Sequence, residues 1–233
     1  MKSLRVILYA LVVAFATSAS AQNFFSNEEP AQLFDIGLRL GINASNRTFP
    51  KGAFNQWSVN SWGTGVDAGC VVDINIRDFI SLQPGLFIET RSSNYAYAHI
   101  YYDQNHEADD LSQLGHDRSA NLTIPILVSL KLNLADNLRA IAEAGPYVQY
   151  YFYDTSTDKV QVVEPQPNPT DPLRVNRTKP ASLDAGLKIG GGISFQRRYS
   201  FFIHYLAGGK KAWKEPLQGG HNKEWLFTIG YNL

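Results

Sequence analysis

The sequence predicts an all-β protein, an eight-stranded antiparallel up-and-down transmembrane β-barrel, and three observations lead to this prediction. Large apolar residues alternate with small or polar ones in eight separate stretches, and successive side chains of a strand point to opposite faces. Short and long connections take turns along the chain. The polar positions hold glycines and isolated charges of both signs, which fits the crowded interior of a small barrel.

A secretory signal peptide, residues 1–21, is expected before the barrel. Lys2 and Arg5 precede an apolar run, and Ala19-x-Ala21 fits a cleavage site. The run is too short to cross ~30 Å of hydrocarbon, which argues against an N-terminal membrane anchor. Cleavage after Ala21 is therefore predicted, and with it export of the mature chain.

The mature chain is expected to hold a short lead, 22–32, and one barrel domain, 33–233. Its single cysteine, Cys70, allows no intramolecular disulfide. The formal net charge of the full chain is zero, so there is no basic excess to bind nucleic acid. No later segment approaches about 18 consecutive apolar residues, which excludes transmembrane helices.

The first four predicted strands are 34–43, 62–76, 80–91 and 122–132. Large or small apolar residues occupy every second position of each strand. The four apolar sets are Phe34, Ile36, Leu38, Leu40 and Ile42; Trp62, Val66, Ala68, Cys70, Val72, Ile74 and Ile76; Ile80, Leu82, Pro84, Leu86 and Ile88; and Leu122, Ile124, Ile126, Val128, Leu130 and Leu132.

The last four predicted strands are about 138–151, 183–195, 199–207 and 225–233. In the sixth, the apolar set is Leu183, Ala185, Leu187, Ile189, Ile193 and Phe195. In the eighth, it is Trp225, Phe227, Ile229, Tyr231 and Leu233. The eighth strand is expected to pair with the seventh and the first, which closes the sheet and removes its edge.

The connections fall into two classes. Strands two and three, four and five, and six and seven are joined by a few residues. The other connections are long and polar, and they include HEADDLSQLGHDRS (106–119) and the proline-rich VVEPQPNPTDPLRVNRTKP (162–180). Short turns at one end and long loops at the other are typical of bacterial outer-membrane barrels, in which the turns face the periplasm.

A water-soluble, lipocalin-like barrel would alternate as well, with its apolar face inward, and the composition of the polar face decides against it. A water-facing surface tends to be dense in Lys, Glu and Thr, whereas this face is rich in glycine. The apolar face is almost free of charge, as hydrocarbon demands, because a mid-plane Arg or Lys costs roughly 2–4 kcal/mol there. The predicted lumen charges are Asp35, Arg39, Asp67, Glu89, Arg91, Lys131, Arg139, Glu143, Asp184 and Lys188.

Aromatic residues gather toward the strand ends, and their placement resembles an interfacial girdle. They are Tyr95, Tyr97, Tyr101, Tyr147, Tyr150, Tyr151, Phe152 and Tyr153. This distribution again favours lipid as the solvent of the outer face.

Four strand motifs, LQPGLFIET, NLTIPILVSLKL, AEAGPYVQYYF and LDAGLKIGGGISF, resemble the corresponding strands of the PorT-like outer-membrane β-barrel family, common in Bacteroidetes. The resemblance covers about 33–233. It implies a stand-alone eight-stranded barrel, similar to OmpA and OmpX barrels, that the barrel-assembly machinery inserts into the outer membrane. The namesake is associated with protein secretion. Such barrels usually end on an aromatic residue, and Leu233 departs from that pattern.

The histidines are the first candidates for chemistry. His99, His106, His116 and His221 are expected in loops, and the segment 106–110 (HEADD) adds carboxylates. Their spacing matches no closed tetrahedral metal site, so the sequence predicts a solvated acidic loop and no metal.

His204 is expected on the lumen side, buried and paired. A catalytic constellation with a carboxylate and a serine would also need a nucleophile within hydrogen-bond reach, and no motif places one. The lumen charges could form an ion pathway, but their near-balance of sign favours a paired, structural polar core.

The favoured function is a non-enzymatic outer-membrane protein with no catalytic, cofactor-binding or metal-binding residues. Its long outer loops would contact a partner or support envelope integrity or protein secretion. A small channel or uptake barrel and an outer-membrane lipid-modifying enzyme are the alternatives. The expected partners are outer-membrane lipid, the barrel-assembly machinery and a secretion or surface protein. Nucleic acid is not expected as a partner, and the barrel is predicted to be monomeric.

Overall fold

The computed structural model describes residues 25–48, 57–102, 108–155, 160–163, 175–178, 180–214 and 219–233. The predicted signal peptide and residues 22–24 of the predicted lead therefore lie outside the described residues. Within these ranges, no helix is long and apolar enough to cross a membrane.

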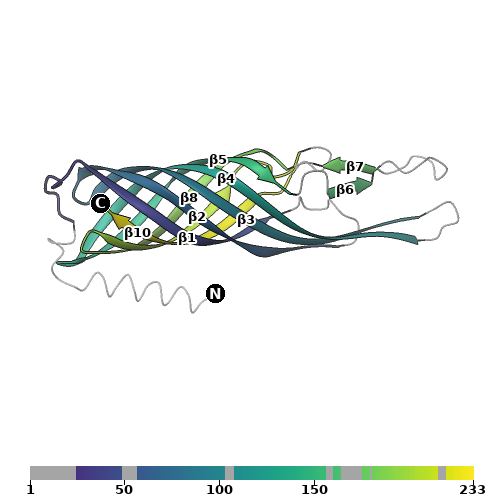
Figure 1. Ribbon diagram of the computed structural model, residues 1–233, viewed down its shortest axis with the longest axis horizontal. Helices are drawn as coiled ribbons and strands as arrows, with labels where there is room; N and C mark the ends of the chain where they lie inside the picture. The colour runs from purple at the N-terminus through teal and green to yellow at the C-terminus, as the bar shows by residue number, and fades with distance from the viewer. Residues whose placement is uncertain are drawn as a thin grey trace.

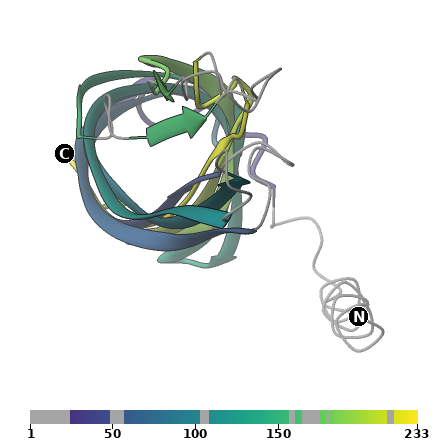
Figure 2. The same ribbon diagram turned by 90° about the vertical axis from the view of Figure 1, so that its right-hand side faces the viewer.

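Eight strands close into an antiparallel barrel, seen from the side in Figure 1 and end-on in Figure 2. They are β1 (Phe34–Arg47), β2 (Trp57–Arg77), β3 (Ile80–Tyr102), β4 (Ala108–Ala135), β5 (Leu138–Asp154), β8 (Leu183–Phe195), β9 (Tyr199–Gly208) and β10 (Asn222–Asn232). Each strand pairs with the strands that precede and follow it around the barrel. The predicted fold class is confirmed.

The last strand closes the sheet as predicted. β10 pairs with β9 on one side and with β1 on the other, over eleven register pairs with β1 that run from Gly37↔Asn232 to Arg47↔Asn222. Beyond the strand, the amide of Leu233 donates to the carbonyl oxygen of Ile36 at 2.9 Å. The terminal strand thus has no free edge.

The alternation of the sequence places the apolar set of every barrel strand on the outer surface. In β10, Phe227 and Ile229 are exposed, whereas Leu226 and Thr228 are buried in the interior. The same division of faces holds in β1, where Leu40 is exposed, and in β8, where Leu187 is exposed. The outer wall is therefore an apolar band and the inner wall carries the polar residues.

The two ends of the barrel differ. Three tight turns, 78–79, 136–137 and 196–198, join β2 to β3, β4 to β5 and β8 to β9 at one end, which we call the turn end. The C-terminus lies at this end in Figure 1. The longer connections lie at the opposite end, which we call the loop end.

The connection between the third and fourth predicted strands is much shorter than predicted. β3 continues to Tyr102 and β4 begins at Ala108, so most of 106–119 is strand. The register runs without a shift from Ile88↔Leu122 to Tyr102↔Ala108. Residues 108–117 of β4 show no apolar alternation, so the sequence does not reveal that they form a strand. Figure 1 shows β2, β3 and β4 projecting beyond the barrel at the loop end.

The proline-rich connection between β5 and β8 also contains structure that the sequence did not predict. β6 (Val160–Val163) and β7 (Val175–Thr178) form a separate two-stranded antiparallel sheet. Each strand is four residues long, which is too short for a periodicity to be recognised.

The aromatic girdle is only partly as predicted. Tyr150, Phe152 and Tyr153 are exposed on the outer wall, but Tyr147 and Tyr151 are buried inside the barrel. The register shifts where Tyr151 pairs with Asn121 and Tyr153 with Ala120, and such a bulge lets the adjacent Phe152 and Tyr153 both face outward. Tyr95, Tyr97 and Tyr101 have no described side chains. At the turn end, a further aromatic set consists of Phe195, Tyr199 and Tyr231.

We predict that a charge in the middle of the apolar band destabilises the barrel far more than the same charge at its rim. Ile189 lies halfway along β8 and is exposed, and Phe195 ends the same strand. Ile189→Arg should lower the free energy of unfolding in lipid vesicles by roughly 2–4 kcal/mol, whereas Phe195→Arg should cost about 0–1 kcal/mol. Denaturant titrations of both variants measure this, and equal losses would contradict a lipid-facing outer wall.

Candidate functional site

The interior of the barrel is the candidate site, because the predicted lumen charges meet there. All ten lie on the inner wall and are buried or partly buried. The most deeply buried are Arg39, Asp67, Glu89, Arg91, Glu143, Asp184 and Lys188. The predicted location of these charges is confirmed, and their contacts divide the interior into three levels.

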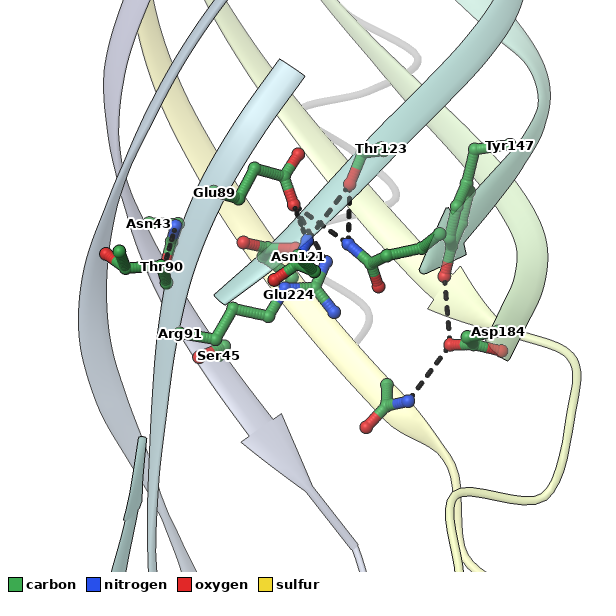
Figure 3. Close-up of polar contacts among 12 residues, drawn as sticks. Asn43, Ser45, Glu89, Thr90, Arg91, Asn121, Thr123, Tyr147, Asp184 and Glu224 are labelled. Carbon is green, nitrogen blue, oxygen red and sulfur yellow. Dashed lines mark hydrogen bonds and ion pairs between the residues drawn. The ribbon is translucent and has the colours of Figure 1, made fainter. Parts of the chain in front are cut away.

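The level toward the loop end is built around Glu89. Its carboxylate accepts hydrogen bonds from Asn121 Nδ2 at 2.9 Å and from Gln149 Nε2 at 2.8 Å. Arg91 forms ion pairs with Glu89 at 3.5 Å and with Glu224, and it donates to the hydroxyl of Tyr151 at 2.8 Å. Figure 3 shows this network spanning the interior. Residues of four strands, β3, β4, β5 and β10, thus meet across the interior in one cluster of hydrogen bonds and ion pairs.

The mouth at the loop end is covered by an aromatic cap. Trp213 is buried, and its indole N–H donates to the carbonyl oxygen of Thr48 at 3.1 Å. Beneath it, the guanidinium of Arg47 lies 5.5 Å from the Trp213 ring and 5.4 Å from the Tyr151 ring. Arg47 is held there by an ion pair with Asp154 at 2.7 Å. The cap leaves a space of only about 20 Å³ below it.

The middle level combines a group of buried apolar side chains with the charged side chains of Arg39, Glu143 and Lys188 and with His204. Val71, Phe87, Leu127 and Phe202 are all buried, and they surround a space of about 10 Å³, too small to hold more than about one water. Glycines make room for the rings. A Cβ at Gly192 would lie 2.6 Å from the Phe202 ring. This level closes the lumen between the two ends.

His204 lies in this middle level, buried and paired as predicted. Its Nε2 is 2.7 Å from the carboxylate of Glu143, and its ring stacks on Phe202. A Cβ at Gly190 would lie 2.6 Å from its ring, so a side chain there would displace the imidazole. Ser129 donates to the other oxygen of Glu143 at 3.4 Å.

The arrangement of Ser129, Glu143 and His204 does not match a nucleophile activated by a histidine base. Such activation needs the hydroxyl within reach of the imidazole, but the serine contacts the carboxylate. The second ring nitrogen of His204, Nδ1, has no partner among the described residues. The geometry fits a structural ion pair.

A vestibule of about 380 Å³ opens at the turn end. Its wall carries Lys131, which donates to Asn75 Oδ1 at 2.8 Å and lies 3.8 Å from Asp73. At its rim, Arg139 pairs with Asp78 at 2.6 Å. Arg39, Glu143 and Phe202 form its floor, and these three residues also line the space in the middle level.

The prediction that His99 and His116 lie in loops is wrong, because His99 belongs to β3 and His116 to β4. His116 and His221 contact different partners. His116 contacts Asn94 and the guanidinium of Arg118, and the backbone amide of His221 donates to Thr48 Oγ1. The side chain of His99 and all of His106 lie outside the described residues. Within the part of the chain that the structure describes, no group of three or more His, Cys, Asp or Glu side chains is placed to hold a metal ion.

Two interior features escaped the sequence interpretation, the apolar side chains of the middle level and the vestibule. Phe87 and Phe202 occupy inward positions of β3 and β9 next to Glu89 and His204, so the alternation could have placed them. The vestibule could not have been found in this way. Its volume depends on which inward side chains meet across the barrel, and that follows from the register.

The family of outer membrane protein β-barrel domains has a model that matches residues 21–208. No curated protein matches the chain.

Three solved structures illustrate the fold. OprG from Pseudomonas aeruginosa is 10% identical, with a TM-score of 0.44 and coverage of 90% of this chain and 99% of that one. Ail, the attachment invasion locus protein of Yersinia pestis, in complex with the heparin analogue sucrose octasulfate, is 7% identical, with a TM-score of 0.38 and coverage of 87% and 100%. The N-terminal β-barrel domain of P. aeruginosa OprF is 11% identical, with a TM-score of 0.34 and coverage of 84% and 97%.

We predict that removal of Arg91 leaves its two carboxylate partners uncompensated. Arg91→Met should lower the free energy of unfolding by roughly 3–5 kcal/mol, because Glu89 and Glu224 stay buried. The double variant Arg91→Met/Glu224→Gln should recover part of the loss, and Arg197→Gln, at an exposed turn residue, should cost less than about 1 kcal/mol. Denaturant unfolding in vesicles provides these values; a double variant no more stable than Arg91→Met would contradict the pairing.

We predict that Asp78, in the turn between β2 and β3, stabilises the fold at neutral pH and that this stabilisation is lost in acid. Burial alone raises the pKa of Asp78, but the hydrogen bond and charge of Arg139 and the charge of Arg197 outweigh it, so the pKa lies below its usual 3.8. A lowered folded-state pKa stabilises the fold above the unfolded-state value, and this contribution is lost as the pH falls through the folded-state pKa.

The measurement compares Asp78→Asn with the wild type at pH 7 and at about pH 2.5. The variant should be less stable at pH 7, and the difference in the free energy of unfolding should shrink in acid. Asp136→Asn in the exposed turn between β4 and β5 is the control. A difference for Asp78→Asn that is unchanged by pH would contradict the assignment.

Proposed function

Since the chain belongs to the outer membrane protein β-barrel domain family, we propose that it is a non-enzymatic outer-membrane protein whose projecting strands bind a partner protein. The turn end then faces the periplasm and the loop end faces the outside. One observation carries this proposal: β2, β3 and β4 continue past the closed barrel as a three-stranded sheet with two open edges.

The registers define these edges. β1 pairs with β2 only as far as Ser45↔Gly63, whereas β2 pairs with β3 out to Trp57↔Ala98. β4 pairs with β5 only from Ser119↔Asp154. Residues 57–62 of β2 and 108–117 of β4 therefore have a strand neighbour on one side only, among the residues that the structure describes.

An open edge can accept another strand. Its outward N–H and C=O groups are unpaired in water, and an extended segment of a partner forms main-chain hydrogen bonds with them. The backbone of Arg118 bonds to Thr155, on the side away from β3. The N–H groups of alternate residues in a strand point to the same edge. The amides of Ser112 and Leu114 therefore point away from β3, as that of Arg118 does.

The closed interior supports this function over the two alternatives. The middle level separates the vestibule from the loop end, which disfavours a channel or uptake barrel. The contact of Ser129 with Glu143 instead of His204 disfavours a lipid-modifying enzyme. The strand motifs that resemble the PorT-like family favour a partner that takes part in protein secretion.

We predict that Leu114→Pro abolishes capture of the partner while the barrel stays folded. Proline removes an amide that points away from β3, so the ladder between β3 and β4 keeps its bonds. Chemical cross-linking on intact cells, followed by purification of the tagged protein, measures capture. Heat-modifiable gel mobility reports the folded barrel.

Leu114→Ala is the matched control, because it removes the same side chain and keeps the amide. A second variant replaces residues 98–112 with Asn-Gly, a two-residue turn that should preserve the pair Tyr97↔Gln113. Equal capture by Leu114→Pro and Leu114→Ala would show that the β4 edge is not used. Capture that survives the shortened hairpin would contradict the proposal for the projecting sheet as a whole.

A further inference from the structure

The floor of the vestibule contains a buried cation without an ion-pair partner. Arg39 is only 6% exposed, and no carboxylate of the described residues lies within 4.0 Å of its guanidinium. Its Nη1 donates to two neutral oxygens, the carbonyl of Leu38 at 3.1 Å and Oδ1 of Asn232 at 3.0 Å. Its Nη2 and Nε have no hydrogen-bond partner among the described residues. Neither atom is among the fully buried atoms that lack a partner, so both retain access to the vestibule.

A second unused donor lies beside Arg39. The hydroxyl of Ser200 is buried and has no hydrogen-bond partner in the described structure. Arg39 pairs with Gly230 in the β1–β10 register, and Gly230 pairs with Ser200 in the β10–β9 register. A Cβ at Gly230 would meet both Ser200 Oγ and Arg39 Nη1. Both distances would be shorter than 3.0 Å, so the two donors pack over the bare backbone of this glycine and lie next to each other on the inner wall.

The other charges on buried or half-buried side chains of the vestibule have partners of their own. Lys131 lies beside Asp73, Arg139 is paired with Asp78, and Glu143 is paired with His204. Asp35 accepts a hydrogen bond from Asn75 at 2.7 Å. The carboxylates of Glu143 and Asp73 act electrostatically on Arg39, although neither forms an ion pair with it among the described residues. They reduce the local positive charge, which favours a ligand with a single negative charge over a polyanion.

Lys188 is the comparison within the same interior. It too has no carboxylate within 4.0 Å among the described residues. Each of the two cations lies over an aromatic ring, Lys188 over Phe87 at 4.8 Å and Arg39 over Phe202 at 5.3 Å. Lys188, however, faces only the space of about 10 Å³ in the middle level. Arg39 faces a cavity of about 380 Å³, within the size range of small-molecule sites. Both side chains are buried cations, but only Arg39 has room for a ligand.

We propose that the floor of the vestibule binds a small oxyanion, a carboxylate or phosphate group of a solute that enters from the turn end. The guanidinium of Arg39 and the hydroxyl of Ser200 are the donors. A planar guanidinium presents parallel N–H groups to two oxygens of a carboxylate or phosphate. The hydroxyl of Ser200 donates to the same group from the opposite side of Gly230. The bound anion supplies the charge partner that Arg39 lacks.

The test is titration calorimetry of the folded mature protein in detergent at low ionic strength. The probes are sodium phosphate and sodium acetate, which distinguish the two sources of an oxyanion, and sodium chloride serves as the competitor. We expect saturable binding of at least one oxyanion. Arg39→Gln and Gly230→Ala should each weaken it about tenfold or more, because one removes the charge-assisted donor and the other pushes both donor side chains out of place.

Two further variants keep the test decisive. Ser200→Ala removes an unpartnered hydroxyl, so it should fold even if Arg39→Gln does not, and it should weaken binding about three- to tenfold. Arg197→Gln removes the same charge from the exposed rim, and it should change affinity less than about threefold. The proposal is overturned if neither oxyanion binds, if Ser200→Ala and Gly230→Ala bind as the wild type does, or if chloride at equal concentration displaces the oxyanion.

Discussion

The pairing of β10 with β1 is the constraint on which the rest of the structure depends. A strand in hydrocarbon must have every backbone N–H and C=O bonded, because each unsatisfied group costs several kcal/mol there. The register from Gly37↔Asn232 to Arg47↔Asn222 provides those bonds for the first and the last strand of the chain. Once the sheet closes with eight strands, its interior is only as wide as the side chains that fill it.

A narrow interior determines how its charges are arranged. With little room for water, a charge on the inner wall must find its partner on another strand. Glu89 and Arg91 of β3 therefore meet Glu224 of β10 and Gln149 of β5 across the barrel. Glu143 of β5 likewise meets His204 of β9. Such pairs tie distant strands together, so the polar interior works with the backbone ladder to keep the barrel in one register.

The sequence predicts the barrel well because one pattern of period two specifies both the strands and their faces. Ile189 and Lys188 could be assigned to opposite walls from their positions alone. The pattern fails where both faces of a strand meet the same solvent. Residues 108–117 of β4 and the short strands β6 and β7 carry no apolar alternation, so they were expected in loops. Tyr147 and Tyr151 were predicted in the interfacial girdle because they are aromatic, but their positions in β5 face inward and both are buried.

Contacts inside the barrel could be predicted only in part, because they depend on register. The sequence shows that Arg39, Ser200 and Gly230 face inward, but not that they share one row across three strands. That row is what makes Arg39 unusual. A buried guanidinium without a carboxylate partner costs stability that a neutral side chain would not, and Arg47, Arg91 and Arg139 all avoid that cost through ion pairs. The Phe202 ring, 5.3 Å from the Arg39 guanidinium, offsets part of that cost, and an anion bound in the vestibule would offset more of it.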